Sequence, residues 1–331
     1  MRRAARRVLW GVALVAFSVS LGPGETSAQP GVRVARVSYF SPGSRGAPGH
    51  TGLRNALREL GYVEGRDILY EDRFADGEFG RLPELAGQLA RARVDVICAV
   101  GPAAIQAAKN ATTTIPIVMA FSGDDPVRSE FVTSLARPGG NITGLTILVA
   151  DLASKRLALL KEGVPGLTRV VALANPTNRS TADERQELGK AARALRVETQ
   201  VVEARSRSQI ESAGAALAKT RAGALLVFAD PVLLANRDRV VAVAAQSRLP
   251  AVYAWREYAD AGGLMAYAPN WEELTQRAAS FVDRILKGAK PADLPIEQPT
   301  RWELIINLRA AKGLGLAMPP ALLRLADHII E

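Results

Sequence analysis

The stretch Ala136–Ile147, "ARPGGNITGLTI", divides the chain into two halves. Two glycines and an asparagine at 139–141 supply the permissive backbone of a turn. A β-branched alternation follows at 142–147, interrupted by Gly144, and it predicts a strand that leads into a polar helix. We interpret this strand as a crossover between two bodies, because the turn and Gly144 give the chain freedom to leave one sheet and enter the next.

Strands and helices alternate on both sides of this crossover. Before it, the expected strands lie at 32–40, 67–74, 94–100 and 115–121, and the expected helices lie at 50–61, 79–92 and 102–111. After it, the expected helices lie at 152–164, 181–195, 209–220 and 237–248, and the expected strands lie at 169–175, 197–204, 223–229 and 250–255. This alternation predicts an α/β fold of two Rossmann-like lobes, each a parallel sheet flanked by helices.

A second feature favours two lobes over one long sheet. A helix expected at 271–288 is followed by an extended segment with prolines at 291, 295 and 299, which indicates a further crossing near 296–300. We therefore expect an N-terminal lobe of residues 29–144 plus 258–296 and a C-terminal lobe of residues 145–257 plus 297–331. Such a protein has its ligand cleft between the carboxyl ends of the two sheets.

The first residues have the layout of a secretory signal. Four arginines among the first seven residues precede the apolar run Val8–Leu21, and the small residues that follow offer a cleavage site after Ala28. The apolar run is too short to span a bilayer comfortably. We therefore expect residues 1–28 to be a signal peptide and the mature protein to be periplasmic and soluble.

Composition and charge are those of a globular protein without a nucleic-acid partner. Hydrophobic residues make up 48% of the chain and charged residues 23%. The formal net charge is +9, and it falls to about +6 without residues 1–28. The basic residues are scattered, without a run of five or six, so we expect no nucleic acid among the partners.

Cysteine, histidine and glycine usage excludes several kinds of site. The single cysteine, Cys98, lies in an apolar run and is expected to be a buried inert thiol, with no disulfide framework. Two histidines, His50 and His328, cannot build a histidine metal cluster, and the sequence holds no G-x-S-x-G nucleophile motif. The glycine spacing at 43–49 is not that of a dinucleotide fingerprint. We therefore expect no catalytic residue, no metal and no cofactor.

Five runs of the sequence resemble one known family. They are "GDDPV" at 123–127, "GGNITGLT" at 139–146, "GGLMAYAPN" at 262–270, "ILKGAKPADLPIEQPTRWELIINLRAAKGLGLAMPP" at 285–320 and "LLRLADHIIE" at 322–331. The chain from about Val32 onward resembles the ABC transporter substrate-binding proteins of the tryptophan/tyrosine-uptake type. The resemblance implies the type I periplasmic-binding fold, with two lobes joined by three crossovers. It also implies two partners, a small solute of the amino-acid class, with aromatic amino acids leading, and a cognate ABC permease. We expect the protein to be a monomer.

The candidate ligand-binding residues are those that follow predicted strands, because the carboxyl ends of parallel strands border the cleft. In the first lobe they are Ser41, Gly101, Pro102, Ala103, Ser122, Asp124 and Asp125. In the second lobe they are Asn175, Thr177, Asp230, Trp255 and Tyr258. Helix-terminal amides suit a carboxylate, a buried carboxylate suits an ammonium, and aromatic faces suit an apolar side chain. Capping, turn formation and hinge packing are the competing roles for these residues.

Three functions fit a two-lobed cleft. The first is a binding protein whose hinge closes on a small solute and creates the face that docks on a permease. The alternative is an exported hydrolase or transferase acting in the same cleft, although adjacent carboxylates such as Asp124 and Asp125 seldom face one reaction centre from both sides. The third is the sensor core of a transcription regulator, which needs a DNA-reading helix pair where the signal stands. We favour the binding protein.

Overall fold

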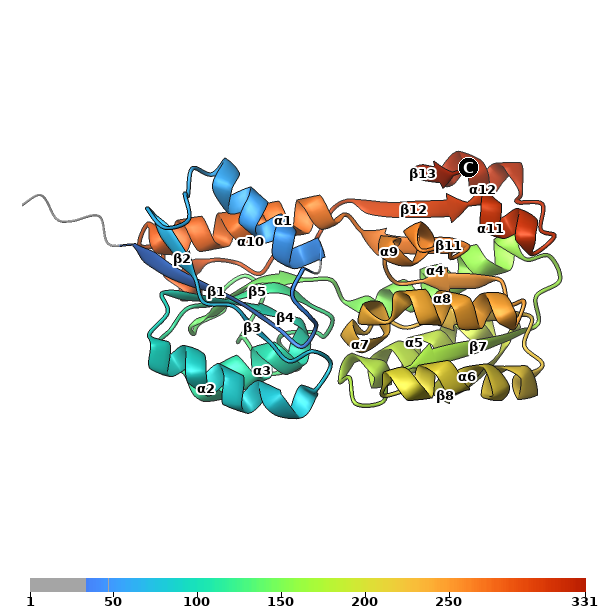
Figure 1. The fold of residues 1–331 in the computed structure, drawn as a ribbon, viewed down its shortest axis with the longest axis horizontal. Coiled ribbons are helices and arrows are strands. Elements are labelled where there is room, and N and C mark those ends of the chain that lie inside the picture. Colours follow the sequence, from blue (N-terminus) through green and yellow to red (C-terminus); the bar gives the residue numbers. More distant parts are fainter. Residues whose placement is uncertain (1–33, 47) are drawn as a thin grey trace, which may run out of the picture. The chain divides into compact units, whose positions relative to one another are not determined.

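The computed structural model of this protein describes residues 34–46 and 48–331. The expected signal peptide, residues 1–28, lies outside the described residues. In the described part the chain forms two sheets, each with helices on both faces (Figure 1). Among these residues, no helix combines the length and the apolar character needed to cross a bilayer.

The first sheet has the strand order β2-β1-β4-β5-β6, with β3 also paired to β1, and its strands pair in parallel. Its strands are β1 (Ala35–Ser41), β2 (Ile68–Tyr70), β3 (Arg73–Phe74), β4 (Val96–Val100), β5 (Ile117–Ser122) and β6 (Ile142–Thr146). Its helices are α1 (Pro48–Glu59), α2 (Leu82–Ala92), α3 (Gly101–Ala111) and α10 (Trp271–Leu286), with the short 3-10 helices η1 (Phe79–Arg81) and η2 (Pro291–Asp293). Helices α1 and α10 lie together on one face, and α2 and α3 lie together on the other (Figure 1).

The residues of β4 show why this sheet is buried on both sides. Val96 and Cys98 belong to the apolar cluster that also contains residues of α1 and α10. Ile97 and Ala99 belong to the cluster that contains residues of α2 and α3. Because successive side chains of a strand point to opposite faces, a continuous apolar run is what a doubly covered strand requires. Cys98 is fully buried, as expected, and burial raises the pKa of its thiol.

The second sheet has the strand order β13-β12-β11-β10-β9-β7-β8. Its strands are β7 (Arg169–Ala174), β8 (Glu198–Glu203), β9 (Ala224–Val227), β10 (Ala251–Tyr253), β11 (Met265–Pro269), β12 (Trp302–Asn307) and β13 (His328–Ile330). Its helices are α4 (Val149–Gly163), α5 (Ser180–Leu195), α6 (Arg207–Thr220), α7 (Pro231–Ala235), α8 (Arg237–Gln246), α9 (Arg256–Asp260), α11 (Leu308–Gly313) and α12 (Pro320–Leu325). Strands β11 and β12 pair antiparallel, and the other pairings are parallel. The prediction of two mostly parallel α/β lobes is confirmed.

Within the described residues the chain passes between the two sheets three times. The first passage runs from β6 into α4, the second from β11 into α10, and the third from η2 into β12. The first and third passages lie side by side, because the Glu297 N–H donates to Gly144 O and the Thr146 N–H donates to Glu297 O, both at 3.0 Å. The backbone hydrogen bonds of one passage therefore support the other.

Two expected lobe boundaries differ from the strand pairing. Residues 145–146 still belong to the first sheet, because Ser122 pairs with Thr146. Residues 265–269 belong to the second sheet, because Met265 pairs with Val252. The return to the first sheet was expected at residue 258, and this is wrong: a turn at 262–263 after α9 brings β11 back beside β10 before the chain leaves.

One expected strand is divided. Residues 67–74 form β2 and β3, which both pair with β1, and the residues between them lie outside the ladder. The side chain of Asp72 accepts a hydrogen bond from the Tyr39 N–H at 2.9 Å. A side-chain acceptor therefore replaces the backbone acceptor at this point of the sheet.

Candidate functional site

A cavity of about 380 Å³ lies where strands of both sheets end. First-lobe residues in its wall include those that follow β1, β4 and β5, and second-lobe residues include those that follow β9 and β10. The carboxyl ends of parallel strands meet at one edge of each sheet, so the fold itself brings these loops together. The cavity is the candidate ligand site.

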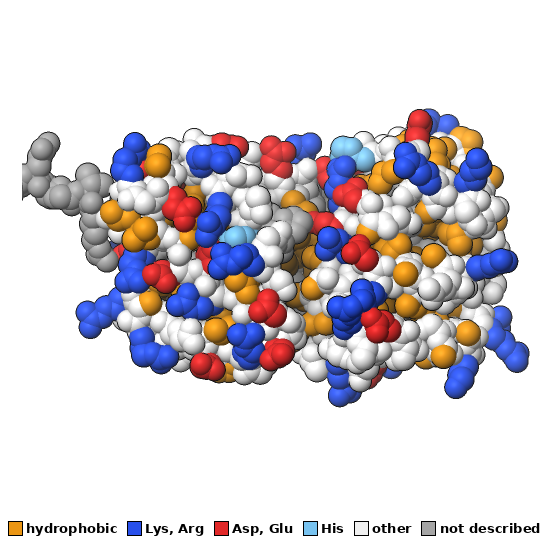
Figure 2. Space-filling model, viewed as in Figure 1, with side chains coloured by type: hydrophobic (Ala, Val, Ile, Leu, Met, Phe, Trp, Pro, Cys, Tyr) orange, Lys and Arg blue, Asp and Glu red, His pale blue; other side chains and the backbone are white. Residues whose placement is uncertain are grey.

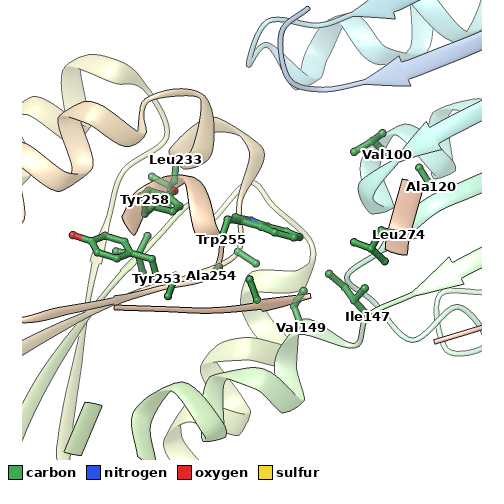
Figure 3. Packing of buried hydrophobic residues seen from close by; sticks show 14 of the residues in the cluster. Val100, Ala120, Ile147, Val149, Leu233, Tyr253, Ala254, Trp255, Tyr258 and Leu274 are labelled. Atoms are coloured by element: carbon green, nitrogen blue, oxygen red, sulfur yellow. The ribbon is translucent and has the colours of Figure 1, made fainter. Parts of the chain in front are cut away.

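Three aromatic rings form one wall of the cavity. Trp255 is the second residue after β10, Phe121 is near the end of β5, and Trp271 is the first residue of α10. The rings of Trp255 and Trp271 stack with centroids 4.8 Å apart, and Phe121 lies 5.4 Å from the first and 5.5 Å from the second. In Figure 3 the Trp255 ring extends from the second lobe towards the side on which Leu274 and Val100 of the first lobe lie. This wall provides flat apolar surface from both lobes.

A cap positions the second tryptophan. The side chain of Asn270 accepts a hydrogen bond from the Glu273 N–H at 2.8 Å, so helix α10 begins at Trp271, directly after the chain leaves β11. The second passage therefore ends at the cavity wall and carries an indole there.

The N-terminus of α3 forms another part of the wall. Gly101, Pro102 and Ala103 line the cavity, and Gly101 has a φ of +77°, which glycine adopts without strain. This conformation turns the chain from β4 directly into α3. The first amides of an α-helix lack acceptors within the helix and favour negative charge. Ser41 also lines the cavity, and its Oγ accepts from the Gly43 N–H at 3.0 Å.

Two carboxyl groups, Asp230 and Glu257, line the second-lobe side. Burial raises the pKa of Asp230 to about 6, although the N–H of Leu233 and the amides of Asn175 and Asn178 oppose the shift. Burial also raises the pKa of Glu257. Arginines 45 and 237 complete the charged lining, so the cavity presents both signs of charge.

The predicted site residues divide into two groups of six. Those that line the cavity are Ser41, Gly101, Pro102, Ala103, Asp230 and Trp255. Those that lie outside its wall are Ser122, Asp124, Asp125, Asn175, Thr177 and Tyr258. That the first group contacts ligand stays a prediction.

The second group has other structural partners. Ser122 is fully buried, and its Oγ accepts from the Asp124 N–H at 3.3 Å. Asp125 accepts from the Val127 N–H at 2.9 Å and so forms a turn. Asn175 accepts from the Thr177 hydroxyl at 2.7 Å, and its amide donates to Asp230 at 3.1 Å. Position after a strand is therefore not sufficient to place a residue in the cavity wall, because residues of these loops also hydrogen-bond one another.

Tyr258 packs away from the cavity. Its ring is fully buried and stacks on Tyr253 with centroids 4.7 Å apart. Trp255 precedes α9 with an extended backbone and lines the cavity, whereas Tyr258 lies within α9 and packs into the second lobe (Figure 3).

The two lobes are in contact beside the cavity. The Ser180 hydroxyl of α5 donates to Asp124 Oδ1 of the first lobe at 2.7 Å. Arg128 forms an ion pair with Asp183 one turn further along α5. These two contacts join the first lobe to α5 of the second lobe. They also direct Asp124 to Ser180 and not towards Asp125, so this pair of carboxylates does not face one reaction centre.

Sequence reasoning missed several wall residues, of which Phe121, Glu257 and Trp271 are the most informative. Phe121 stands directly before the predicted Ser122, and Glu257 stands between the predicted Trp255 and Tyr258. A test of neighbouring positions in the same loops would have found both. Trp271 is the first residue of a helix that the sequence predicts. Its place at the cavity could have been inferred because this helix begins where the chain crosses between the lobes.

Metal chemistry finds no support within residues 34–46 and 48–331. Their histidine, cysteine, aspartate and glutamate side chains form no group of three that could hold a metal ion.

The buried carboxyl groups near the cavity lead to a prediction on pH. Glu184 of α5 is fully buried and accepts from the N–H of Ala229, a wall residue, at 3.2 Å. Burial raises the pKa of Glu184 to about 8 and that of Asp230 to about 6, from ordinary values of 4.5 and 3.8. Between the ordinary and the raised value the folded protein binds more protons than the unfolded chain, so its stability falls as the pH rises. We expect a lower melting temperature at pH 8 than at pH 5.

Thermal denaturation in the absence of ligand measures this difference. The variant Glu184→Gln removes the larger of the two shifts and should show a smaller difference between pH 5 and pH 8. A melting temperature that is equal or higher at pH 8 in the unmodified protein would contradict the prediction.

Comparisons with known proteins agree with this arrangement. A family model described as "ABC transporter substrate binding protein" matches residues 46–330. A tyrosine-binding protein of Clostridioides difficile (strain R20291) is 25% identical over 265 residues, which are 80% of this chain and 76% of that protein. The crystal structure of a conserved domain protein from Vibrio cholerae O1 biovar El Tor has a TM-score of 0.84 at 25% identity, covering 90% of this chain and all of that one. An ABC domain from Streptococcus pneumonia in complex with L-Trp has a TM-score of 0.82 at 23% identity, with the same coverage.

Proposed function

Because this chain belongs to the ABC transporter substrate-binding protein family, we propose that it binds an aromatic amino acid in the cavity between its lobes and delivers it to a membrane permease. The family is one of binding proteins, and solute binding is the function of its members. What is proposed here is the class of solute.

The observation that carries the proposal is the aromatic wall formed by Phe121, Trp255 and Trp271. Aromatic rings prefer offset-stacked or edge-to-face contacts with centroids about 4.5–7 Å apart, and these pairs bury large areas. The two indoles now stack on each other at 4.8 Å. A flat ligand ring fits against such a wall better than a sugar or a branched aliphatic side chain does.

The polar part of the wall suits the remainder of an amino acid. The N-terminus of α3 offers amides and a favourable dipole to a carboxylate. The second-lobe side of the cavity also carries carboxyl groups, and a carboxylate there offers an acceptor to an ammonium. A zwitterion with a ring therefore finds a complementary group for each of its parts.

Closure follows from the placement of these groups. Trp271 and α3 belong to the first lobe, and Trp255 belongs to the second, so one ligand contacts both lobes. A ligand that binds the closed state more tightly than the open state shifts the population towards closure. The ion pair of Arg128 with Asp183 and the hydrogen bond of Ser180 to Asp124 then stabilise the closed state.

The cellular setting is part of the proposal. Substrate-binding proteins of this family act outside the cytoplasmic membrane, and we place this chain in the periplasm as a monomer, exported by the signal at residues 1–28. On the face drawn in Figure 2, basic and acidic side chains are interspersed over both lobes. Such a surface suits a freely diffusing carrier.

Calorimetric titration of the ligand-stripped protein tests the proposal. L-tryptophan, L-tyrosine and L-phenylalanine should bind, and L-leucine, L-glutamate and glucose should bind much more weakly. We expect Trp271→Ala to weaken the binding of the aromatic amino acids by about 10- to 100-fold, because the ligand ring loses a stacking partner.

Trp302→Ala is the matched control. Trp302 stacks near Tyr267 in the second lobe, with centroids 6.2 Å apart, and is not part of the cavity wall. Its replacement should leave affinity within about threefold. Equal losses for the two variants, or tighter binding of glucose or L-glutamate than of any aromatic amino acid, would refute the proposal.

A further inference from the structure

Among the described residues, two carboxyl groups line the cavity, and they differ in the hydrogen bonds that their oxygen atoms accept. Asp230 is 1% exposed, and both of its oxygens accept hydrogen bonds. Oδ1 accepts from the Leu233 N–H at 2.8 Å, and Oδ2 accepts from the side-chain amides of Asn175 and Asn178, both at 3.1 Å. Asp230 is the N-cap of α7, and both of its oxygen atoms accept hydrogen bonds from residues of the second lobe.

Glu257 is the other carboxyl group. Its Oε2 is buried from solvent and has no hydrogen-bond partner among the residues described. Burial is the main influence on this side chain and disfavours its charge, while Arg237 and the nearby Trp271 indole favour the charged form. The Trp271 indole lies close enough to this carboxyl group to favour its charge, and the Trp271 Nε1 is also buried without a well-formed hydrogen bond among the residues described.

A buried carboxylate oxygen without a donor is costly to a protein. Native proteins pair nearly all such atoms, and an exception indicates a partner that comes from outside the chain. Glu257 is in the first turn of α9, two residues after Trp255, so its carboxyl group and the indole reach the cavity from the same loop. A partner of Glu257 would therefore lie beside a ring stacked on the aromatic wall.

We infer that Glu257 binds the ammonium group of an amino-acid ligand and determines its selectivity, whereas Asp230 is a structural cap that does not. This inference rests on the proposed function and names the residue that recognises the charged nitrogen. An ammonium has three donors and a full positive charge, which is what a desolvated carboxylate requires. The α3 N-terminus lies in the first lobe and Glu257 in the second, so the two charged ends of a zwitterion engage different lobes.

The test compares ligands that differ only in the ammonium group. Purified protein, Glu257→Gln and Asp230→Asn are titrated with L-tryptophan and with indole-3-propionate, which lacks the amino group. We expect Glu257→Gln to weaken L-tryptophan binding by about 10- to 100-fold and to leave indole-3-propionate within about threefold. L-tyrosine and 3-(4-hydroxyphenyl)propionate form a second pair with the same expectation.

Asp230→Asn is the matched control. The variant exchanges one acceptor oxygen for an NH2 group that faces the donors of its neighbours and so disturbs the start of α7. It should therefore change the affinity for both members of a pair by the same factor. Folding of both variants is checked from their melting temperatures without ligand. Glu257→Gln should melt no lower than the unmodified protein, because it removes an unpaired buried charge.

The outcomes separate the two proposals. If the unmodified protein binds neither amino acid, the proposed function fails and this inference fails with it. If it binds them but Glu257→Gln weakens both members of a pair equally, or neither, the assignment of Glu257 is overturned while the proposed function stands. A loss confined to the amino acids in Asp230→Asn would assign the ammonium to Asp230 and also overturn the inference.

Discussion

At pH 9, where the Glu184 carboxyl group with its pKa of about 8 is mostly ionised, replacement of Arg156 by methionine is expected to lower the free energy of unfolding by about 3–5 kcal/mol. Arg156 of α4 is 1% exposed, and its guanidinium lies 3.7 Å from Glu184 Oε2, itself fully buried. Its Nε donates to the carbonyl of Tyr267 at 3.1 Å. Methionine fills a similar volume but leaves Glu184 in an apolar environment without its counter-charge.

Chemical denaturation of three variants measures this effect. The double variant Arg156→Met with Glu184→Gln should recover much of the loss, because the uncompensated charge is gone. Lys190→Met is the surface control: Lys190 pairs with Glu187 on α5 in solvent, and its loss should cost about 0.5 kcal/mol or less. A single Arg156→Met variant as stable as the Lys190 variant would show that the buried pair does not hold the second lobe together.

The Arg156–Glu184 pair also contacts the two loops, after β9 and after β10, by which the second lobe borders the cavity. Arg156 donates to the carbonyl of Ala254 at 3.4 Å, next to Trp255, and Glu184 accepts from Ala229, next to Asp230. The ends of β9 and β10 are therefore held by one buried ion pair.

Replacement of Gly144 by alanine is expected to cost about 3 kcal/mol or more, or to prevent folding. Gly144 has a φ of +123° in β6, a conformation that side chains disfavour. An added Cβ would lie 2.3 Å from the carbonyl oxygen of Met119 and 2.6 Å from its nitrogen. Both are backbone atoms of the neighbouring strand, so β5 and β6 would have to separate where the first and third passages meet.

Gly140→Ala is the matched control in the same stretch. Gly140 is exposed, and an added Cβ would meet no atom of the described residues within 4 Å. Its replacement should change stability by no more than about 0.5 kcal/mol. Denaturant midpoints of the two variants give the comparison, and similar midpoints would contradict the role of Gly144.

The candidate site was predictable where one local rule governs it. Ser41, Gly101 and Trp255 lie at the cavity because the residue that ends or follows a parallel strand is at the cleft edge. The rule does not tell which side chain turns inward, so it also selected Ser122 and Tyr258, which pack into their own lobes.

The aromatic wall could not be predicted by that rule, because the rule does not say which loops meet in space. Phe121, Trp255 and Trp271 are separated by up to 150 residues of sequence, and each sits on a different segment. Their rings meet because β5, β10 and the second passage converge, which depends on the order of strands in two sheets.

By itself, the sequence determined the alternation of strands and helices, the two sheets and the glycine at the junction, since these follow from local periodicity and backbone freedom. Only the tertiary structure decided that β11 stays in the second sheet. It also decided that both oxygens of Asp230 accept hydrogen bonds from neighbouring residues, whereas Glu257 Oε2 is buried without such a partner among the residues described. The reason is that hydrogen-bond satisfaction and stacking depend on atoms brought together across the whole chain, and a pattern of neighbouring residues does not contain them.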